Sequence, residues 1–419
     1  MSRFLVYLSP AVGHTLPAVP GLVELRRRGH EVAVRTHPDL VPVLGGLGLD
    51  AASVSPGVLD VPVTDHLAST DKERVHAGQV DLIARGRHDG PDLAAALAEV
   101  RPDAVLVDTN AYGAQVVAEA SGLPRATLMP SVLAMPGRGI PPYGLGLAPK
   151  QGPLGKVRDA LGWMIMEHLF GRSMLPGLNE LRHEHGLAPY SSPLQIQGST
   201  DMVLLMTGEP LEYPRTDLPA HVRMVGAAPW DLPAERPGWL DEPGDPWVLV
   251  TCSTEYQGDE NLARTAVEAL RDEPVRVLLT LADAYDGAGV TSSGNVRVER
   301  FVPHGQVLPE TAVVVCPGGT GIVSKAMVHG VPMVLVPWGR DQPEVARRVA
   351  VAGAGTILPP KRLTAQRLRA AVREAQGMRE AARAAGERLT AGDPAGRFAD
   401  AALELVSVSR DAGSAARTA

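Results

Sequence analysis

The same alternation of short apolar segments and helical segments occurs in both halves of this chain. In the first half, an apolar run at residues 4–8 leads through a loop into a helical pattern over Leu16–Arg28 and a second apolar run at Glu31–Thr36. The alternation continues at Ala104–Asp108, an apolar run that precedes a helical pattern over Tyr112–Ser121. This arrangement is typical of parallel sheets that helices cover on both faces. It predicts a doubly wound α/β domain.

The second half repeats the alternation after a proline-rich stretch. Its predicted strands lie at Trp247–Thr251, Val275–Leu279, Val296–Arg300, Ala312–Cys316 and Met333–Val336. Prolines disfavour regular structure, so residues 210–246 are expected to be a linker, apart from a short strand at His221–Val225. We therefore expect two doubly wound domains in tandem, with the ligand site between them, outside the carboxyl ends of the strands.

The domain boundaries follow from these patterns. Residues 1–209 are expected to form an N-terminal domain and residues 247–390 a C-terminal domain, on either side of the linker. The last part of the chain is helical in pattern, and we expect residues 391–419, a helix and a tail, to return to the N-terminal domain.

Two regions of the first half have mixed patterns. Residues 55–100 and 135–195 combine helical spacing with glycine and proline. They fit either long insertions that shape a binding cleft or a pair of helices, and the pattern favours neither.

The composition excludes several classes of protein. Of the 419 residues, 45% are hydrophobic and 21% are charged, so the chain is not disordered, collagen-like or a coiled coil. A formal net charge of −7 argues against a nucleic-acid binder. The two cysteines, Cys252 and Cys316, are too few for a disulfide framework, and we expect a cytoplasmic location. We expect no signal peptide, and no run reaches the roughly 20 apolar residues of a membrane span.

Glycines cluster in a predicted strand-to-helix loop at residues 316–321 (CPGGTG). Gly318, Gly319 and Gly321 leave room for backbone N–H groups to approach an anion, and the start of a helix adds partial positive charge. The loop fits a diphosphate site, although an ordinary tight turn has the same pattern. It matches neither GxGxxG nor GxxxxGK[ST], which disfavours a dehydrogenase or a P-loop ATPase.

A histidine and an aspartate lie at the ends of predicted strands in the first half. His14 is in the first strand–helix loop, and Asp108 is at the carboxyl end of a later strand, so both face the same rim of a parallel sheet. An aspartate that binds a histidine fixes its tautomer and raises its basicity, which predicts a general base. The alternatives are a histidine that closes a helix start and an aspartate that caps the next helix.

A carboxylate and an amide follow the predicted strand at Met333–Val336. Asp341 and Gln342 together offer hydrogen bonds to several hydroxyls of a sugar. The alternative is that they cap the helix that begins near Glu344.

Taken together, these features resemble the family 1 nucleotide-sugar-dependent glycosyltransferases, especially the actinobacterial enzymes that act on macrolides, enediynes and aromatic polyketides. In the first half, residues 8–14 (LSPAVGH) and 28–32 (RGHEV) resemble the N-terminal signature of the family. In the second half the resemblance is carried by residues 301–309 (FVPHGQVLP), 316–321, 330–332 (GVP) and 336–344 (VPWGRDQPE). The resemblance covers nearly the whole chain.

The resemblance implies a GT-B fold, in which two Rossmann-like domains face each other across a cleft. It places the acceptor in the N-terminal domain and the donor in the C-terminal domain. It assigns His14 as catalytic base and Asp108 as the residue that orients it. The predicted acceptor-binding residues are Asn110, Tyr112 and Tyr143.

The donor-binding residues are also implied by the resemblance. Phe301 and Val302 fall where the nucleobase binds, the loop from Pro317 to Gly321 falls on the diphosphate, and Thr254 falls near the phosphates. Asp341 and Gln342 fall on the pair that binds the donor sugar. The full predicted set is Thr254, Phe301, Val302, Pro317, Gly318, Gly319, Thr320, Gly321, Lys325, Trp338, Asp341 and Gln342.

Three positions depart from the family pattern. Pro317 stands where the family usually has His, Ile322 where it has Ser or Thr, and Lys325 where it often has Glu. Each lost hydrogen bond to a charged group is worth about 1.5–3 kcal/mol. Loss of the carboxylate that usually holds the ribose diol favours a 2′-deoxy donor such as a dTDP-sugar over a UDP-sugar, and Lys325 offers a positive charge instead.

The predicted function is a metal-independent, inverting glycosyltransferase that moves a sugar, or deoxysugar, from a dTDP- or UDP-linked donor to a hydroxyl of a hydrophobic natural product. We expect no cofactor besides this co-substrate, no nucleic-acid partner, and a monomer or homodimer. The alternative is a catalytically silent homologue that acts as an accessory or binding protein. The altered phosphate loop favours this alternative. A GT-B-like sugar-nucleotide epimerase fits less well, because the first half resembles an acceptor-binding domain.

Overall fold

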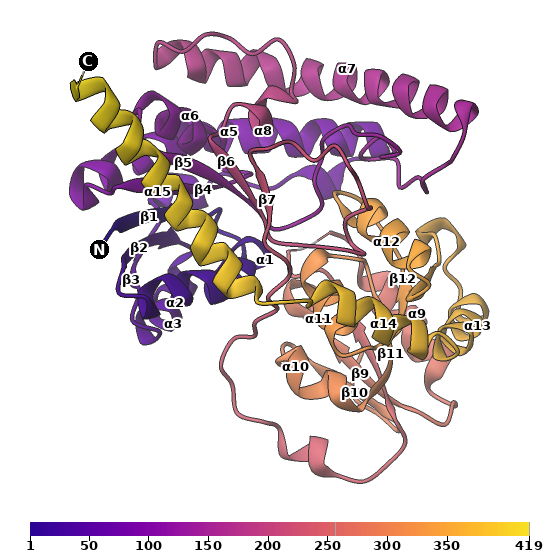
Figure 1. The fold of residues 1–419 in the computed structure, drawn as a ribbon. Coiled ribbons are helices and arrows are strands. Elements are labelled where there is room, and N and C mark those ends of the chain that lie inside the picture. The colour runs from indigo at the N-terminus through magenta and orange to yellow at the C-terminus, as the bar shows by residue number, and fades with distance from the viewer. Residues whose placement is uncertain (256, 419) are drawn as a thin grey trace.

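The first half of the chain forms a parallel sheet whose strand order reverses once. The computed structural model describes residues 1–255 and 257–418, with side chains described outside position 71 and residues 408–418. Over these residues the first sheet has seven strands in the order β3-β2-β1-β4-β5-β6-β7 (Figure 1). All neighbouring pairs are parallel. The strands are β1 (Arg3–Tyr7), β2 (Glu31–Thr36), β3 (Asp50–Ser53), β4 (Ala104–Asp108), β5 (Arg125–Met129), β6 (Met202–Leu205) and β7 (Val222–Met224).

Successive side chains of these strands face two different layers of helices. On β1, Phe4 and Val6 belong to one apolar core and Leu5 and Tyr7 to another, and all four are fully buried. Side chains alternate across a strand, so a continuous apolar run requires cover on both faces. This requirement explains why the apolar runs of the sequence predicted β1, β2 and β4.

Two long helices occupy the regions that the sequence left open. The helices of this half are α1 (Val12–Thr15), α2 (Val19–Arg27), α3 (Val41–Gly46), α4 (Pro56–Leu59), α5 (Asp71–Val100), α6 (Tyr112–Ala120), α7 (Pro153–Glu184) and α8 (Gln195–Gly198). Helices α5 and α7 contact each other and supply the helix pair that was one of the two alternatives. Residues 130–152, between β5 and α7, run as a loop.

The second half repeats the same winding. Within the described residues its sheet has six parallel strands in the order β10-β9-β8-β11-β12-β13. They are β8 (Trp247–Thr251), β9 (Arg276–Thr280), β10 (Val296–Glu299), β11 (Thr311–Cys316), β12 (Met333–Leu335) and β13 (Gly355–Ile357). The helices are α9 (Glu260–Leu270), α10 (His304–Val307), α11 (Thr320–Val328), α12 (Gln342–Val351), α13 (Ala365–Gln376) and α14 (Arg379–Leu389).

The proline-rich segment divides between the two halves. The strand expected near His221–Val225 is present as β7, and it extends the first sheet. Beyond it, the chain runs as a long loop around the second half (Figure 1). Leu240 lies in the core of the second half, and the indole of Trp239 packs edge-on against that of Trp247.

The last helix, α15 (Pro394–Thr418), runs back to the first half (Figure 1). It packs on α2, where Phe398 fills the space above Gly21. A Cβ atom on residue 21 would lie 2.3 Å from the Phe398 ring, so this close approach requires glycine. Arg28 reinforces the contact through an ion pair with Asp400.

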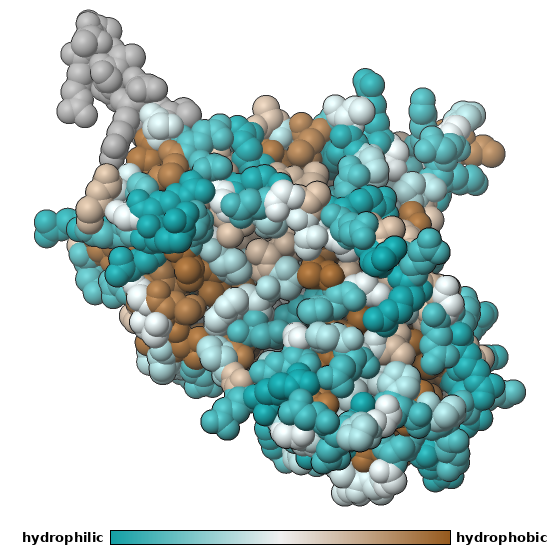
Figure 2. All heavy atoms as spheres, turned by 60° about the horizontal axis from the view of Figure 1, so that its bottom comes forward, coloured by the Kyte–Doolittle hydropathy of each residue, from teal (hydrophilic) through white to brown (hydrophobic). Residues whose placement is uncertain are grey.

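Hydrophobic side chains are distributed in separate patches on the face of the molecule drawn in Figure 2, where hydrophilic residues predominate. Among the described residues, none of the helices combines the length and the apolar character that crossing a membrane requires.

Candidate active site

The candidate site begins where the strand order of each sheet reverses. In the first sheet this point lies between β1 and β4, and in the second between β8 and β11. Loops leave such neighbouring strands in opposite directions, which opens a crevice at their carboxyl ends. His14 lies on α1, directly after β1, and Asp108 is the last residue of β4.

The structure brings His14 and Asp108 into direct contact. The Nδ1 atom of His14 lies 2.8 Å from Oδ2 of Asp108, which is fully buried. The other carboxylate oxygen, Oδ1, accepts hydrogen bonds from the Ser9 hydroxyl at 2.7 Å and from the backbone N–H of Asn110 at 2.9 Å. The N-cap of the following helix is Ala111, so Asp108 does not cap it. These bonds hold the carboxylate in a single orientation toward His14.

Electrostatics in this pair favour the charged forms. Burial lowers the pKa of His14, but the charge of Asp108 and its hydrogen bond outweigh burial, and the net pKa is raised above the usual value. Burial raises the pKa of Asp108, but the charge of His14 and the hydrogen bonds from His14, Ser9 and Asn110 lower it further than burial raises it. The aspartate therefore stays ionised and supports an imidazolium.

The second nitrogen of His14 faces Asn110. The hydrogen bond to Asp108 places the proton of neutral His14 on Nδ1, so Nε2 carries the lone pair. Asn110 Nδ2 lies 3.2 Å from this Nε2 atom. The His14 side chain is 24% exposed. Nε2 is thus the nitrogen of neutral His14 that can accept a proton.

The glycine loop of the second sheet has the geometry of an anion site. Gly318 has a φ of +102°, a conformation that favours glycine. Gly319 is the N-cap of α11 without a side-chain hydrogen bond, and the positions of a Cβ on Gly319 or Gly321 are open space. The first backbone N–H groups of a helix are unpaired and carry partial positive charge. Pro317, at the start of the loop, contributes no N–H.

Asp341 is held between the two halves. It is the N-cap of α12, but its side chain makes no capping bond. Its Oδ2 atom instead accepts hydrogen bonds from Ser131 at 2.5 Å and from Thr320 at 3.1 Å. Ser131 follows β5 in the first half and also lies 2.9 Å from the Thr320 hydroxyl. The carboxylate and the start of α11 thus both face the first half.

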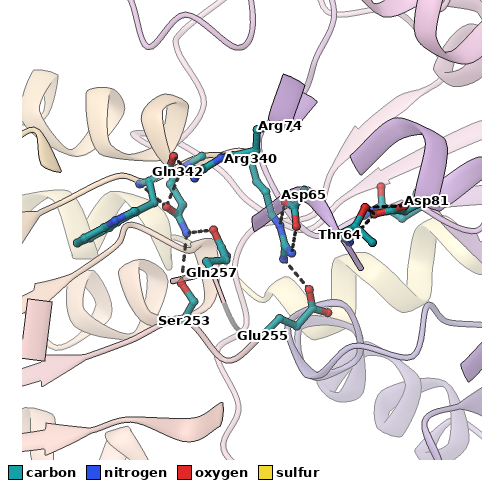
Figure 3. A network of polar contacts seen from close by, with 12 residues as sticks. Thr64, Asp65, Arg74, Asp81, Ser253, Glu255, Gln257, Arg340 and Gln342 are labelled. Carbon is teal, nitrogen blue, oxygen red and sulfur yellow. Dashed lines mark hydrogen bonds and ion pairs between the residues drawn. The ribbon is translucent and has the colours of Figure 1, made fainter. Parts of the chain in front are cut away.

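Gln342 lies beside Asp341 in the sequence but faces the interior of the second half. Its Oε1 atom accepts from the backbone N–H groups of Trp338 at 2.8 Å and Gly339 at 3.3 Å. Its Nε2 atom donates to Gln257 at 3.0 Å and contacts the Ser253 hydroxyl at 3.4 Å (Figure 3). In this structure the amide shapes the loop before α12 and presents neither polar atom to the junction.

The remaining predicted donor residues of the second half differ in how exposed they are. Thr254 is exposed in the loop after β8. Phe301 is 52% exposed just after β10, whereas Val302 is buried in the core. Trp338 is half-buried and packs against the core on the other face of the sheet.

The positive charge of Lys325 has a partner within the protein. Its ammonium group forms an ion pair with Asp231 from the segment after β7, and the Lys325 side chain is 14% exposed. Asp231 also accepts the backbone N–H of Gly305 at 2.9 Å. Burial raises the pKa of Asp231, but the charge of Lys325 and the hydrogen bonds from Lys325 and from the Gly305 backbone together outweigh that effect, so the net pKa is lowered. The extra charge expected for a ligand is therefore largely neutralised.

Of the two predicted acceptor tyrosines, Tyr112 is buried and Tyr143 is partly buried, and neither is hydrogen-bonded to His14 in the part of the chain that the structure describes. Tyr112 lies in a cluster with Ile83 and Met174, between α5, α6 and α7. Tyr143 belongs to the loop of residues 130–152 and packs against the core of the second half. Burial, and after it the charges of Asp341 and Glu344, raise the pKa of Tyr143.

Several residues of this site were missed by the sequence reasoning. Ser9 directly follows the β1 region, and Ser131 follows β5, so their places at the carboxyl ends of strands were an available signal. Arg340 and Asp65 were also missed. They form an ion pair although they are 275 positions apart. A local sequence pattern cannot predict such a contact.

Comparisons with known proteins identify the family. Residues 268–397 match the family described as erythromycin biosynthesis protein CIII-like, C-terminal domain. The 4′-demethylrebeccamycin synthase of Lentzea aerocolonigenes is 33% identical over 387 residues, which are 89% of this chain and 91% of that protein.

Solved structures share the fold over almost the whole length. The glycosyltransferase of kitacinnamycin superposes with a TM-score of 0.74 at 22% identity, covering 97% of this chain and 99% of that one. Glycosyltransferase VinC, solved in complex with dTDP, has a TM-score of 0.68 at 25% identity, covering 98% and 100% of the two chains. The predicted GT-B fold is confirmed. This chain belongs to the GT-B glycosyltransferases of actinobacterial natural-product pathways.

Proposed function

We propose that this glycosyltransferase moves a sugar from a dTDP-linked donor to a hydroxyl of an apolar natural product by one inverting displacement. The observation that carries the proposal is the 2.8 Å contact between His14 Nδ1 and the buried Asp108. It fixes the ring and leaves Nε2 as the proton acceptor.

The displacement uses His14 as the general base. Nε2 takes the proton of the acceptor hydroxyl while the oxygen attacks the anomeric carbon of the donor. The bond between that carbon and the diphosphate breaks, and its electron pair leaves with the diphosphate. Because one bond forms as the opposite one breaks, the configuration inverts. Asp108 stabilises the imidazolium that results.

The donor is assigned to the loop of residues 316–321 and to Asp341. The start of α11 offers unpaired N–H groups and partial positive charge to the leaving diphosphate. Asp341 accepts hydroxyl hydrogen bonds from Ser131 and Thr320, and hydroxyls of the donor sugar are chemically equivalent donors. The dTDP bound to VinC, at 25% identity to this chain, and Lys325 in place of a ribose-binding carboxylate favour dTDP over UDP.

Binding and turnover test this proposal separately. Calorimetry with dTDP, UDP and GDP is expected to show micromolar binding of dTDP and weaker binding of the other two. Turnover is then measured with a dTDP-sugar and an aglycone found by screening. His14→Ala is expected to lower kcat at least about 100-fold, whereas His185→Ala, at an exposed position after α7, keeps full turnover. Full turnover of His14→Ala would remove the assigned base.

A further inference from the structure

The loop that carries Asp341 is held by residues of the other half of the molecule. We call residues 338–342, which run from the loop after β12 to the first residue of α12, the donor loop. Arg74, on α5, donates from Nη1 to the backbone oxygen of Trp338 at 2.8 Å. Gly339 permits this approach, because a Cβ on it would lie 2.7 Å from the Arg74 side chain. The first half therefore contacts the donor loop near both ends, through Arg74 at Trp338 and through Ser131 at Asp341.

Arg340 makes three further hydrogen bonds from this loop, all of them to carboxylates. Its guanidinium binds Asp65 in a bidentate manner, Nε to Oδ2 at 2.8 Å and Nη2 to Oδ1 at 3.0 Å. Its third nitrogen, Nη1, binds Glu255 at 2.5 Å, so the guanidinium lies between the two carboxylates (Figure 3). Asp65 comes from the short helical turn Asp65–Leu67 ahead of α5, and Glu255 from the loop after β8.

The burial of Asp65 makes this ion pair specific. Asp65 is 3% exposed, and the Arg340 side chain is 29% exposed. A buried carboxylate without its partner is costly, so the pair strongly favours the arrangement in which both are present. A planar guanidinium can bind both oxygens of Asp65 and still reach Glu255, which a lysine ammonium cannot.

The backbone of Arg340 has an unusual conformation at the point where its side chain leaves the second half. Arg340 has a φ of +54°, in the left-handed region that a non-glycine residue rarely adopts. Its side chain points out of the second half toward Asp65, and the next residue along the chain is Asp341. Asp341 is thus the direct neighbour of a residue that is anchored in the opposite half.

We propose that Arg340 is a positioning residue for the donor sugar. Through Asp65, the first half fixes the donor loop and thereby the carboxylate of Asp341, so recognition of the sugar depends on contact between the two halves. This inference rests on the proposed role of Asp341 in binding the donor sugar. The nucleotide part of the donor, which we assign to the loop of residues 316–321, does not depend on Arg340.

Calorimetry with two probes tests the proposal. In Arg340→Lys and in Asp65→Asn, affinity for dTDP-glucose is expected to fall about 10-fold, the effect of one charged hydrogen bond, while affinity for dTDP stays within about 2-fold. The double variant is expected to lose no more than the weaker-binding single variant, because both changes break one interaction. Arg373→Lys, in an exposed ion pair with Glu273, is the matched control and is expected to leave both affinities unchanged.

The outcomes separate this inference from the proposed function. Wild-type protein that binds neither dTDP nor UDP would remove the proposed donor site. Wild-type binding of dTDP together with unchanged dTDP-glucose affinity in both variants would overturn the role of Arg340. Losses that multiply in the double variant, or an equal loss for dTDP itself, would mean that each residue acts on the fold instead. Melting temperatures near that of the wild type identify the variants that are folded.

Discussion

Asn110 Nδ2 lies 3.2 Å from Nε2 of His14, on the side of the imidazole opposite Asp108. An N–H donor at this position stabilises neutral His14, because only the neutral ring offers a lone pair at Nε2. Any acceptor hydroxyl that reaches Nε2 must share or displace this bond.

The first prediction concerns this contact. Asn110→Ala removes the donor to Nε2 and is expected to raise the pKa of His14 further. The acid limb of the kcat/KM profile, which reports deprotonation of the base, then moves to higher pH. The backbone N–H of residue 110 still reaches Asp108 in this variant. A shift to lower pH would contradict the assignment of the lone pair to Nε2.

Asp108→Asn moves the same limb in the opposite direction. Loss of the carboxylate charge leaves burial as the dominant influence on His14, so the pKa of His14 falls and the acid limb moves to lower pH. At the same time kcat is expected to fall about 10³- to 10⁴-fold, because the imidazolium loses its counter-ion. Asp39→Asn, at an exposed position, serves as the control in the same pH series. An unchanged kcat would remove Asp108 from the mechanism.

The buried carboxyl group of Asp89 is expected to make the stability of the protein depend on pH. Its Oδ1 atom accepts the backbone N–H of Ala114 at 2.7 Å, and Oδ2 has no hydrogen-bond partner among the described residues. Burial raises the pKa of Asp89 to about 7. Between the unfolded pKa, near 4, and this value, the folded state binds more protons than the unfolded state, so stability falls as pH rises.

Asp89→Asn tests this dependence because the amide oxygen can keep the bond to Ala114 without a charge. The variant is expected to melt at a higher temperature than wild type at pH 8, and the difference is expected to shrink at pH 5. A difference that is larger at pH 5 would contradict the raised pKa. Thermal denaturation followed by circular dichroism at both pH values measures it.

Gly113 is predicted to be required where α5 crosses α6. A Cβ at this position would lie 1.8 Å from the backbone oxygen of Gly86, so Gly113→Ala forces two helix backbones apart. We expect a loss of about 3 kcal/mol in the free energy of unfolding. Gly45→Ala, on α3 with open space around the new methyl group, is the control and is expected to be neutral or slightly stabilising. Urea denaturation compares the two.

Variants of Lys325 test whether its ammonium group serves a structural ion pair or contacts a ligand. Lys325→Met leaves Asp231 without its partner and is expected to cost about 2–3 kcal/mol of stability, which adding Asp231→Asn largely restores. Affinity for dTDP is expected to change less than about 3-fold, because the charge is already paired. A large loss of dTDP affinity in a stable Lys325→Met protein would instead place the ammonium on a phosphate.

The strands and the His14–Asp108 pair could be predicted because their signals are local. β2 and β4 coincide with the predicted segments, since a strand that is buried on both faces must be apolar along its length. The positions of His14 and Asp108 then follow from the strand ends. β3 and β13 were missed, because they are short and only partly buried. β6 was missed as well, although it is fully buried, because the strand is only four residues long.

Helices α5 and α7 could not be recognised with the same ease. Both contain an internal proline, Pro91 and Pro176, and several glycines that usually end helices. The structure gives a reason for the glycines, since Gly86 lies against Gly113 and Gly177 against Ile83. Glycine here serves close packing between helices, which a single helix pattern does not reveal.

The partners of the Gln342 side chain could not be predicted from its neighbours in the sequence. Its place beside Asp341 suggested that both side chains serve the same ligand. In the structure their partners differ, because the carboxylate of Asp341 accepts hydrogen bonds from Ser131 and Thr320, whereas the amide of Gln342 has partners on Gln257 and on the backbone of Trp338. Which of two adjacent side chains faces the junction depends on loops that only tertiary folding brings together.

The return of α15 to the first half has a mechanical consequence. The polypeptide passes between the halves once after β7 and again before α15, where Phe398 anchors it on Gly21. Two crossings restrain relative motion far more than one, because both must flex together. Any rotation of one half against the other is thereby confined to an axis close to the line that joins the two crossings.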